Sequence, residues 1–457
     1  MIEIDNANLP LKAFIHNKRY FLYTPISNRL LEITKPQYSE VILLKRIGIK
    51  EYLEMSNDST SRNDVITLIK KGVICNSTIQ NIEQAYTENV VDILSRSIHS
   101  ITLQVTRKCN FVCRYCLFGE RNNIGRTHSN EFMPYEIAKK SIDFLYEHSY
   151  DSADITVAFY GGEPLINFEL IKKIVEYSEN IFHAKKITFR MTTNGSLLNE
   201  NISDYLADHQ FVIAISLDGP EHIQNKHRKF NINGSDTFSR VMSNIDLLSR
   251  KYPEYYTKNV SFIPVVFPDQ DYTEVYDFFA NTMGINEKNI IPLIADLGGI
   301  DYTFKGVSSY DSTLSNSLEK LDDGKMKDIA IKKQNIPLTW NHGGQCLPGF
   351  KDLFVDVLGN FYPCEKAIES SGMSIGNLHS GLNVEKILSF FNIGRLTEEE
   401  CKSCWAMRFC EICVVHCYDL ETDTVNKESK LRACDIQKRK VLTFLKHYID
   451  GFNNSNR

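Results

Sequence analysis

The stretch SITLQVTRKCNFVCRYC, residues 100–116, decides the fold of this chain, because it joins a short apolar run to three closely spaced cysteines. The apolar run predicts a β-strand, and Cys109, Cys113 and Cys116 follow directly after it. Thiolates are preferred ligands of iron–sulfur clusters, and three of them on a cube of four irons leave one iron open to a small molecule. A structural zinc site would need a fourth ligand, for which His128 could be proposed. The spacing favours an iron–sulfur cluster.

Downstream of this stretch, apolar runs alternate with amphipathic stretches. The strand-like runs lie at 101–105, 155–159, 187–191, 211–216, 260–266 and 290–294, and the helical patterns lie at 135–148, 168–181, 199–208, 237–250 and 272–283. Strand–helix alternation predicts a parallel sheet covered by helices, which is the α/β class. The number of units fits an open (β/α)6 barrel better than a closed barrel of eight strands. We assign this partial barrel to residues 99–300.

A smaller domain is expected before the barrel, in residues 1–98. Strand patterns at 13–16 and 19–23 predict a hairpin, and helical patterns follow at 36–46 and 64–71. This order predicts an α+β domain of a few strands and three helices.

Two further segments follow the barrel. Residues 301–340 are polar and predict a bridge, whereas residues 341–457 hold eight cysteines and end in a helical pattern at 430–448. A region of that composition would depend on metal clusters for its stability.

The overall composition excludes several classes of partner. The chain has 457 residues, 42% of them apolar, and a formal net charge of −5, so no basic excess indicates binding to nucleic acid or to an anionic membrane. The first residues lack the pattern of a signal peptide, and no apolar run is long enough to span a bilayer. We therefore expect a cytoplasmic protein.

The twelve cysteines allow two interpretations. A disulfide framework is typical of small secreted domains, whereas clustered cysteines in a reducing compartment are more often metal ligands. All except Cys75 fall into two groups, which favours metal ligands. Cys75 alone is expected to be a small buried apolar residue.

The CxxxCxxC motif with Tyr115 before its last cysteine resembles the signature of the radical S-adenosylmethionine (radical SAM) superfamily. Further motifs fall at the ends of successive predicted strands, where β/α barrels bind their ligands. The residues that the resemblance assigns to S-adenosylmethionine are Tyr115, Gly161, Gly162, Glu163, Asn194, Ser216, Asp218 and Arg228. Glu163 would accept hydrogen bonds from the methionine amino group, and glycines would let the backbone approach closely. Polar turn caps are the alternative for each of these motifs.

The second cysteine group resembles the SPASM domain, a C-terminal module of many peptide-modifying radical SAM enzymes. Its members here are Cys346, Cys364, Cys401, Cys404, Cys410, Cys413, Cys417 and Cys434. The family pattern would place one cysteine at Val414, where this chain instead has Cys413 and Cys417. Zinc ribbons remain the alternative for the CxxC pairs.

By this resemblance, the tail holds two auxiliary [4Fe–4S] clusters. The outer one would use Cys401, Cys404, Cys410 and Cys434, and the inner one would use Cys346, Cys364 and one or both of Cys413 and Cys417. Glu365 follows Cys364, and the matching acidic residue of SPASM sulfatase-maturing enzymes is proposed as a base. A glutamate there would take the proton released during crosslinking; an ordinary solvated glutamate is the alternative.

The resemblance also implies a function. The layout is similar to that of thioether-forming peptide maturases of the sactipeptide and ranthipeptide type, whose N-terminal winged-helix-like domain binds the leader of a precursor peptide as an added strand. It implies that S-adenosylmethionine is cleaved to a 5′-deoxyadenosyl radical, which removes a hydrogen from the peptide before sulfur joins carbon. An electron donor such as flavodoxin or ferredoxin is implied.

Other activities remain open for this layout. They are a sulfatase-type formylglycine maturase, a carbon–carbon crosslinking or epimerising maturase, and a peptide-binding scaffold without catalysis. The scaffold is disfavoured, because the cubane cysteines and Glu163 are all present.

Overall fold

The computed structural model describes residues 9–56, 59–116, 118–119, 128–267, 272–294, 327–330, 336–341 and 347–455. Cys346 and most of the expected bridge at 301–340 lie outside the described residues. In the described part of the chain, no helix is both long and apolar enough to cross a membrane.

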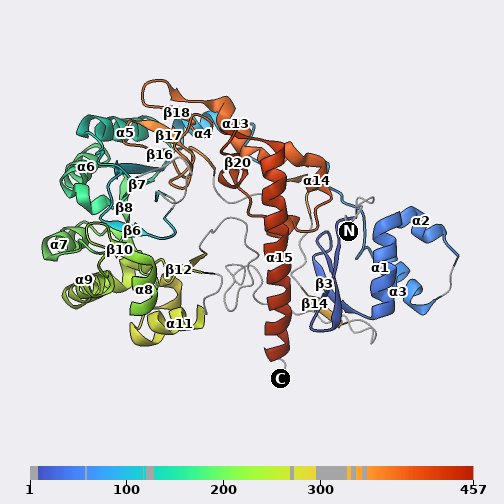
Figure 1. Cartoon of the computed structure of the whole chain (residues 1–457). Coiled ribbons are helices and arrows are strands. Elements are labelled where there is room, and N and C mark those ends of the chain that lie inside the picture. The colour runs from blue at the N-terminus through green and yellow to red at the C-terminus, as the bar shows by residue number, and fades with distance from the viewer. Residues whose placement is uncertain are drawn as a thin grey trace.

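The partial barrel predicted from the sequence is present (Figure 1). Its parallel strands are β5 (Ser100–Thr106), β7 (Asp154–Gly161), β8 (Lys186–Thr193), β9 (Val212–Ile215) and β11 (Val260–Phe262), followed by β12 (Val265–Val266), which pairs with β13 (Leu293–Ile294). The expected strand at 260–266 is therefore split into β11 and β12. The covering helices are α5 (Tyr135–Glu147), α6 (Phe168–Ile181), α7 (Glu200–Asp208), α8 (Glu221–His227), α9 (Phe238–Lys251), α10 (Pro253–Asn259) and α11 (Tyr272–Asp277). The α/β class and the partial barrel are confirmed.

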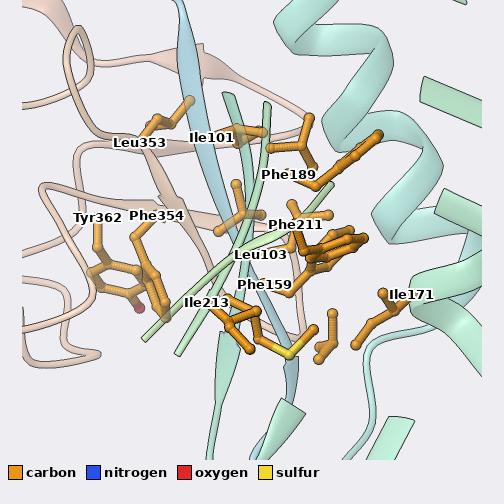
Figure 2. Close-up of a cluster of buried hydrophobic side chains, with 14 of the residues drawn as sticks. Ile101, Leu103, Phe159, Ile171, Phe189, Phe211, Ile213, Leu353, Phe354 and Tyr362 are labelled. Carbon is orange, nitrogen blue, oxygen red and sulfur yellow. The ribbon is translucent and has the colours of Figure 1, made fainter. Parts of the chain in front are cut away.

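One face of the barrel strands forms the hydrophobic core. Side chains of Ile101, Leu103, Phe159 and Phe189 gather between the sheet and its helices (Figure 2). Phe211 completes this cluster, with its ring centroid 5.3 Å from that of Phe189. Because side chains alternate along a strand, the residues between these positions face the concave side of the barrel, where a ligand can reach them.

The barrel sheet continues into the C-terminal region, which the sequence analysis did not anticipate. Strand β16 (Phe354–Val355) pairs in parallel with β5, and β17 (Asn360–Tyr362), β18 (Gly376–Asn377) and β19 (Gly381–Leu382) follow as antiparallel neighbours. Leu353 lies beside Ile101, and Phe354 and Tyr362 lie next to each other in the same core cluster (Figure 2). The cysteine-rich region is therefore built onto the edge of the barrel.

The N-terminal region forms its own sheet, in the order β1 (Lys12–His16), β2 (Arg19–Thr24), β3 (Arg29–Ile33) and β14 (Lys327–Ala330). The predicted hairpin is confirmed, with Asn17 and Lys18 at positive φ as a two-residue turn requires. Helices α1 (Lys35–Ile47), α2 (Ile49–Glu54) and α3 (Thr60–Lys70) cover one face. The strand β14 comes from the expected bridge and pairs with β3.

Short elements connect these parts. They are β4 (Asn81–Ile82), which pairs with β15 (Thr339–Trp340), then α4 (Val90–Arg96), β6 (Phe111–Cys113), β10 (Arg228–Phe230), α13 (Val384–Phe391), α14 (Glu398–Lys402), β20 (Tyr418–Asp419) and β21 (Thr424–Val425). The long helix α15 (Lys427–Ser455) ends the described chain and stands between the N-terminal domain and the other parts (Figure 1). It packs against the N-terminal sheet through Val441, Phe444 and Leu445.

Candidate active site

The first cysteine group lies directly beyond the carboxyl end of β5. Cys113 ends β6, which pairs antiparallel with β10 and places Cys113 opposite Arg228. Burial raises the pKa of all three thiols, that of Cys113 to about 12. Cys113 and Cys116 both raise the pKa of Cys109 further. Three half-buried cysteines that lie near one another are a donor set suited to iron, which binds them as thiolates.

Arg228 belongs to a buried cluster behind these thiols. Its Nε lies 3.1 Å from Oδ2 of Asp218, and its Nη1 lies 4.0 Å from the sulfur of Cys113. The Tyr115 hydroxyl donates to both oxygens of Asp218, at 2.8 and 2.7 Å, and the Arg228 guanidinium lies over the Tyr115 ring. Asp218 is 0% exposed. The structure therefore brings together three of the residues that the resemblance assigned to the cofactor, and it places them beside Cys113, one of the predicted cluster ligands.

Glu163 ends the β7 segment in a fully buried position. Its Oε1 accepts hydrogen bonds from the Thr193 hydroxyl at 2.8 Å and from the Leu165 N–H at 3.1 Å, and its Oε2 accepts from the Asn194 N–H at 2.7 Å. Burial is the largest influence and raises its pKa to about 7, although these three donors oppose the shift. The carboxylate is thus fixed at the strand ends and is sensitive to any cation that approaches it.

The glycines before Glu163 are required by close backbone contact. A Cβ on Gly161, which has φ of +149°, would lie 2.2 Å from the Thr106 carbonyl oxygen, and one on Gly162 would lie 2.3 Å from that of Lys108. These contacts hold the end of β7 against the loop that carries the first cysteines. The close approach assigned to a ligand in the sequence analysis is thus seen here between two parts of the chain.

Asn194 fixes the same loop from the end of β8. Its amide donates to Asn110 Oδ1 at 2.8 Å, and the Asn110 amide donates to the Ser196 hydroxyl at 2.8 Å. Ser216 follows β9 and is half-buried, with its N–H on the Thr193 carbonyl. Asn110 and Ser196 were not singled out in the sequence analysis; the position of Asn110 next to Cys109 was the available signal.

His128 approaches the first cysteine group. Its Nε2 lies 3.6 Å from the Cys116 sulfur, and its Nδ1 lies 3.1 Å from the Arg107 carbonyl oxygen. A carbonyl accepts only, so Nδ1 carries the proton and Nε2 presents a lone pair to Cys116. In the described residues, however, no group of three or more His, Cys, Asp or Glu side chains is placed to hold a single metal ion.

The described tail cysteines gather into two neighbouring groups. Cys401, Cys404 and Cys434 all raise the pKa of the Cys410 thiol, after burial as the largest influence, so these four face one another. They are the residues that the resemblance assigned to the outer cluster.

Cys413 lies toward the other group, since it raises the pKa of Cys364. Burial raises the pKa of the Cys413 thiol, but the hydrogen bond with His416, at 3.4 Å, lowers it overall. Cys417 is 0% exposed. Burial is the largest influence that raises the pKa of its thiol, and Cys413, Cys434 and Cys401 raise it further. It therefore lies between the two groups.

Glu365 pairs with a carboxyl group that the sequence analysis missed. Burial, and then Glu365, raise the pKa of Asp352 to about 8, while the Thr102 hydroxyl, 3.1 Å away on β5, and Arg190 of β8 lower it. Burial and the neighbouring carboxylate both favour the protonated form of Asp352, which lies beside the barrel strands.

Comparison with known proteins defines the class. Residues 103–280 match the model of the radical SAM superfamily. These residues form a radical SAM domain, and the resemblance drawn from the cysteine motif is confirmed.

The relatives add to this assignment. The chain is 24% identical to the radical SAM cyclopropyl synthase TigE of Paramaledivibacter caminithermalis, over 95% of each protein. It is also 24% identical to the cysteine-type anaerobic sulfatase-maturating enzyme of Clostridium perfringens, over 69% of this chain and 88% of that enzyme. The solved structure of native anSMEcpe with bound AdoMet and Cp18Cys peptide shares the fold, with a TM-score of 0.54 and 21% identity over 78% of this chain and 99% of that one.

Proposed function

We propose that this enzyme removes two hydrogens from a ribosomally made precursor peptide and joins a cysteine sulfur to a carbon of another residue. The observation that carries the proposal is the continuous sheet that links the two cysteine groups. The first group follows the carboxyl end of β5, and Cys364 follows β17, which is two strands away and runs antiparallel to β16, so that Cys364 lies toward the amino end of β5. One sheet thus fixes the two groups relative to each other, which supports a reaction that needs hydrogen removal and then electron removal at a second group.

The residues at the strand ends fit S-adenosylmethionine on an open iron of a [4Fe–4S] cluster. When bound, these groups supply a 5′-deoxyadenosyl radical. In our proposal, Cys109, Cys113 and Cys116 bind the irons, Glu163 accepts hydrogen bonds from the methionine amino group, and Ser216 contacts the nucleotide. Gly161, Gly162 and Asn194 fix the loop that carries the first cysteines.

Arg228 would neutralise negative charge beside Cys113. Asp218 and Tyr115 hold the guanidinium in place, and in our proposal it pairs with the methionine carboxylate. We assign Asp218 to holding Arg228 rather than to a direct contact with the ligand, because Tyr115 and Arg228 already occupy its oxygens.

In the tail, we propose that Cys401, Cys404, Cys410 and Cys434 hold the outer auxiliary cluster, and that Cys364, Cys413 and Cys417, together with Cys346, hold the inner one. The influence of Cys413 on Cys364 and the influences of the outer cysteines on Cys410 support this division. Cys417 is influenced by members of both groups and is assigned to the inner cluster by the resemblance. Thiols grouped in this way are a donor set that iron binds as thiolates.

Glu365 is the proposed base that takes the proton from the substrate. Asp352 keeps its own proton in the pair and donates it toward Glu365, so Glu365 is held in one orientation. A base must lie within hydrogen-bond reach of its proton, and the position beside β5 and Cys364 provides that reach for a peptide in the barrel.

The N-terminal sheet is the proposed site for the peptide leader. Strand β14 covers the edge of β3, and among the described strands none pairs with the outer edge of β1. A leader would add to β1 or replace β14, since an extended peptide gains main-chain hydrogen bonds at a sheet edge. The match to TigE over 95% of each chain includes this domain, which supports a role in the reaction.

The test is co-expression of this chain with a cysteine-containing candidate peptide under anaerobic conditions, followed by mass spectrometry. Thioether formation removes two hydrogens and leaves no thiol for alkylation by iodoacetamide. A product that has lost sulfur would instead identify formylglycine formation, and an unchanged mass with an altered stereocentre would identify epimerisation. Either result would exclude the thioether proposal.

A second candidate is formation of a cyclopropane ring, which the full-length similarity to a cyclopropyl synthase favours. This reaction also removes two hydrogens, so mass alone does not distinguish it from a thioether. A peptide that loses two hydrogens but contains no cysteine, or whose cysteine still reacts with iodoacetamide, would assign this activity.

A further inference from the structure

A lysine lies buried among the tail cysteines. Lys430 is 0% exposed, and its ammonium donates to the Thr397 hydroxyl and lies 3.4 Å from the Cys401 sulfur. It also lowers the pKa of the Cys417 and Cys434 thiols, against the larger effect of burial. One ammonium therefore faces three thiols that belong to different turns of the chain.

No carboxylate in the described residues lies within 4.0 Å of Lys430. Lys430 contributes to lowering the pKa of Glu400, but the Glu400 carboxylate is paired with Lys427, at 2.7 Å. An unpaired charge in the interior costs several kcal/mol, of order 3–5 when a partner is missing. The structure thus contains a buried cation that lacks a conventional counter-ion.

The N-terminal end of the helix that carries Lys430 further destabilises a positive charge at this position. Lys430 lies in the first turn of α15, and side chains point back toward the helix N-terminus, where the helix dipole is positive. Cys434 is one turn further along and on the same face, four residues away. A negative charge beside Cys401 and Cys434 would compensate for both effects.

We propose that Lys430 is the counter-ion of the outer auxiliary cluster and raises the reduction potential of that cluster. Metal ligands are thiolates, so iron bound to Cys401, Cys404, Cys410 and Cys434 brings the missing negative charge to the ammonium. One-electron reduction adds one more negative charge to the cluster, and the nearby cation stabilises the reduced form. Net charge and hydrogen bonds to sulfur set the potentials of such clusters.

This inference rests on the proposed function for its consequence. The spare electron of the peptide radical would be accepted by the outer cluster, since the buried cation makes that cluster easier to reduce than one without it. Lys430 is a positioning residue in this scheme and has no contact with the peptide.

The experiment uses the reconstituted full chain with Cys109, Cys113 and Cys116 changed to Ala, so that only tail clusters remain. Redox titration with dithionite, followed by electron paramagnetic resonance, gives their midpoint potentials. Lys430→Met removes the charge and keeps the side-chain length, and we expect the reduction equilibrium of one tail cluster to fall at least about tenfold, which is 59 mV for a one-electron couple. Lys430→Arg keeps the charge and should restore the equilibrium to within about threefold.

Lys438→Met is the matched control on the same helix. Lys438 lowers the pKa of Cys404 but is only half-buried, so solvent screens its charge and its removal should have a smaller effect. An equal or larger shift in Lys438→Met would overturn the special role of the buried site.

Iron content separates the remaining outcomes. If Lys430→Met loses one cluster while Lys430→Arg retains it, the charge is needed to hold the cluster, which supports the proposal. If Lys430→Met keeps its iron and its potentials, or if both variants lose the cluster equally, the proposal is wrong. If Lys430→Met shows the expected shift in potential but the enzyme with all its cysteines leaves the peptide unaltered, the proposed function is wrong and the role of Lys430 stands.

Discussion

The two cysteine groups of this enzyme are held by different kinds of structure. The first group follows β5 and is fixed by polar side chains from neighbouring strand ends, such as Glu163 and Asn194. The outer tail group lies on α14, on turns of a few residues and on the first part of α15, and none of its four cysteines lies in a strand or directly follows a barrel strand. A site built on strands keeps its shape without its metal, whereas a site built on short turns depends on the metal to hold it together.

The largest expected effect separates the two groups by activity. Cys109→Ala should reduce formation of 5′-deoxyadenosine by about a thousandfold or more, since removal of one essential ligand abolishes a chemical step worth at least about 4 kcal/mol. Cys410→Ala should leave cofactor cleavage detectable while modification of the peptide stops. The measurement is chromatography of deoxyadenosine beside mass spectrometry of the peptide. Full peptide modification by Cys410→Ala would contradict the roles assigned here.

The polar scaffold of the first group can be broken without touching a cysteine. Asp218→Asn leaves the buried Arg228 guanidinium without its counter-charge and should lower the free energy of unfolding of this region by about 3–5 kcal/mol. The rate of hydrogen exchange at β9 and β10 in the iron-free protein measures this loss of local stability.

The control for this change is Asp236→Asn. Asp236 is the exposed ion-pair partner of Lys229, and Lys229 lies next to Arg228 on β10. An exposed ion pair contributes only about 0–1 kcal/mol, so little change is expected. Equal exchange in the two variants would show that the Arg228 cluster does not hold the first site.

Removal of iron tests the comparison directly. Chelation should accelerate hydrogen exchange in residues 401–426 by about a hundredfold or more, which corresponds to about 2.7 kcal/mol of local opening free energy. Exchange in β7 and β8 should change by less than about threefold. If both regions open to the same extent, the difference between a strand-built and a metal-built site is refuted.

The smallest effect concerns pH. Burial raises the pKa of Glu163 from 4.5 to about 7, so the folded apo chain holds a proton that the unfolded chain releases between these values. The free energy of unfolding therefore falls as pH rises from about 4.5 to about 7. An ammonium ligand needs the ionised form, so S-adenosylmethionine should bind about tenfold more tightly at pH 8 than at pH 6.

Equilibrium dialysis of the reconstituted enzyme measures this change. Glu163→Gln cannot ionise and supplies the reference for titration of the ligand itself. The difference between wild type and variant across this pH range should be close to tenfold. A wild-type profile parallel to that of Glu163→Gln would remove Glu163 from the amino-group site.

Much of the fold could be predicted because it depends on local pattern. The strand at 101–105 and the helix at 168–181 are found at β5 and α6, since alternation and helical period are properties of neighbouring residues. The proposed ligands of the first cluster were also chosen from spacing within one loop. The pairing of β16 with β5 could not be predicted, because a two-residue strand carries almost no signal and its partner lies some 250 residues away.

The same distinction applies to the candidate site. Sequence spacing singled out Glu163, Asp218 and Arg228, but it did not show that Asp218 forms an ion pair with Arg228. It also did not show that Asp352 lies beside Glu365. Lys430 looked like any helix-surface lysine, although its spacing of four residues from Cys434 was a signal that could have been used.

The sequence by itself determined the class of chemistry, because thiol spacing and strand–helix order are local and survive in a linear string. Only the tertiary structure decided which charges are buried and what lies against them. Burial depends on segments that meet from distant parts of the chain. It raises the pKa of Glu163 to about 7, and it leaves the Lys430 ammonium in the interior without a carboxylate of the described residues beside it.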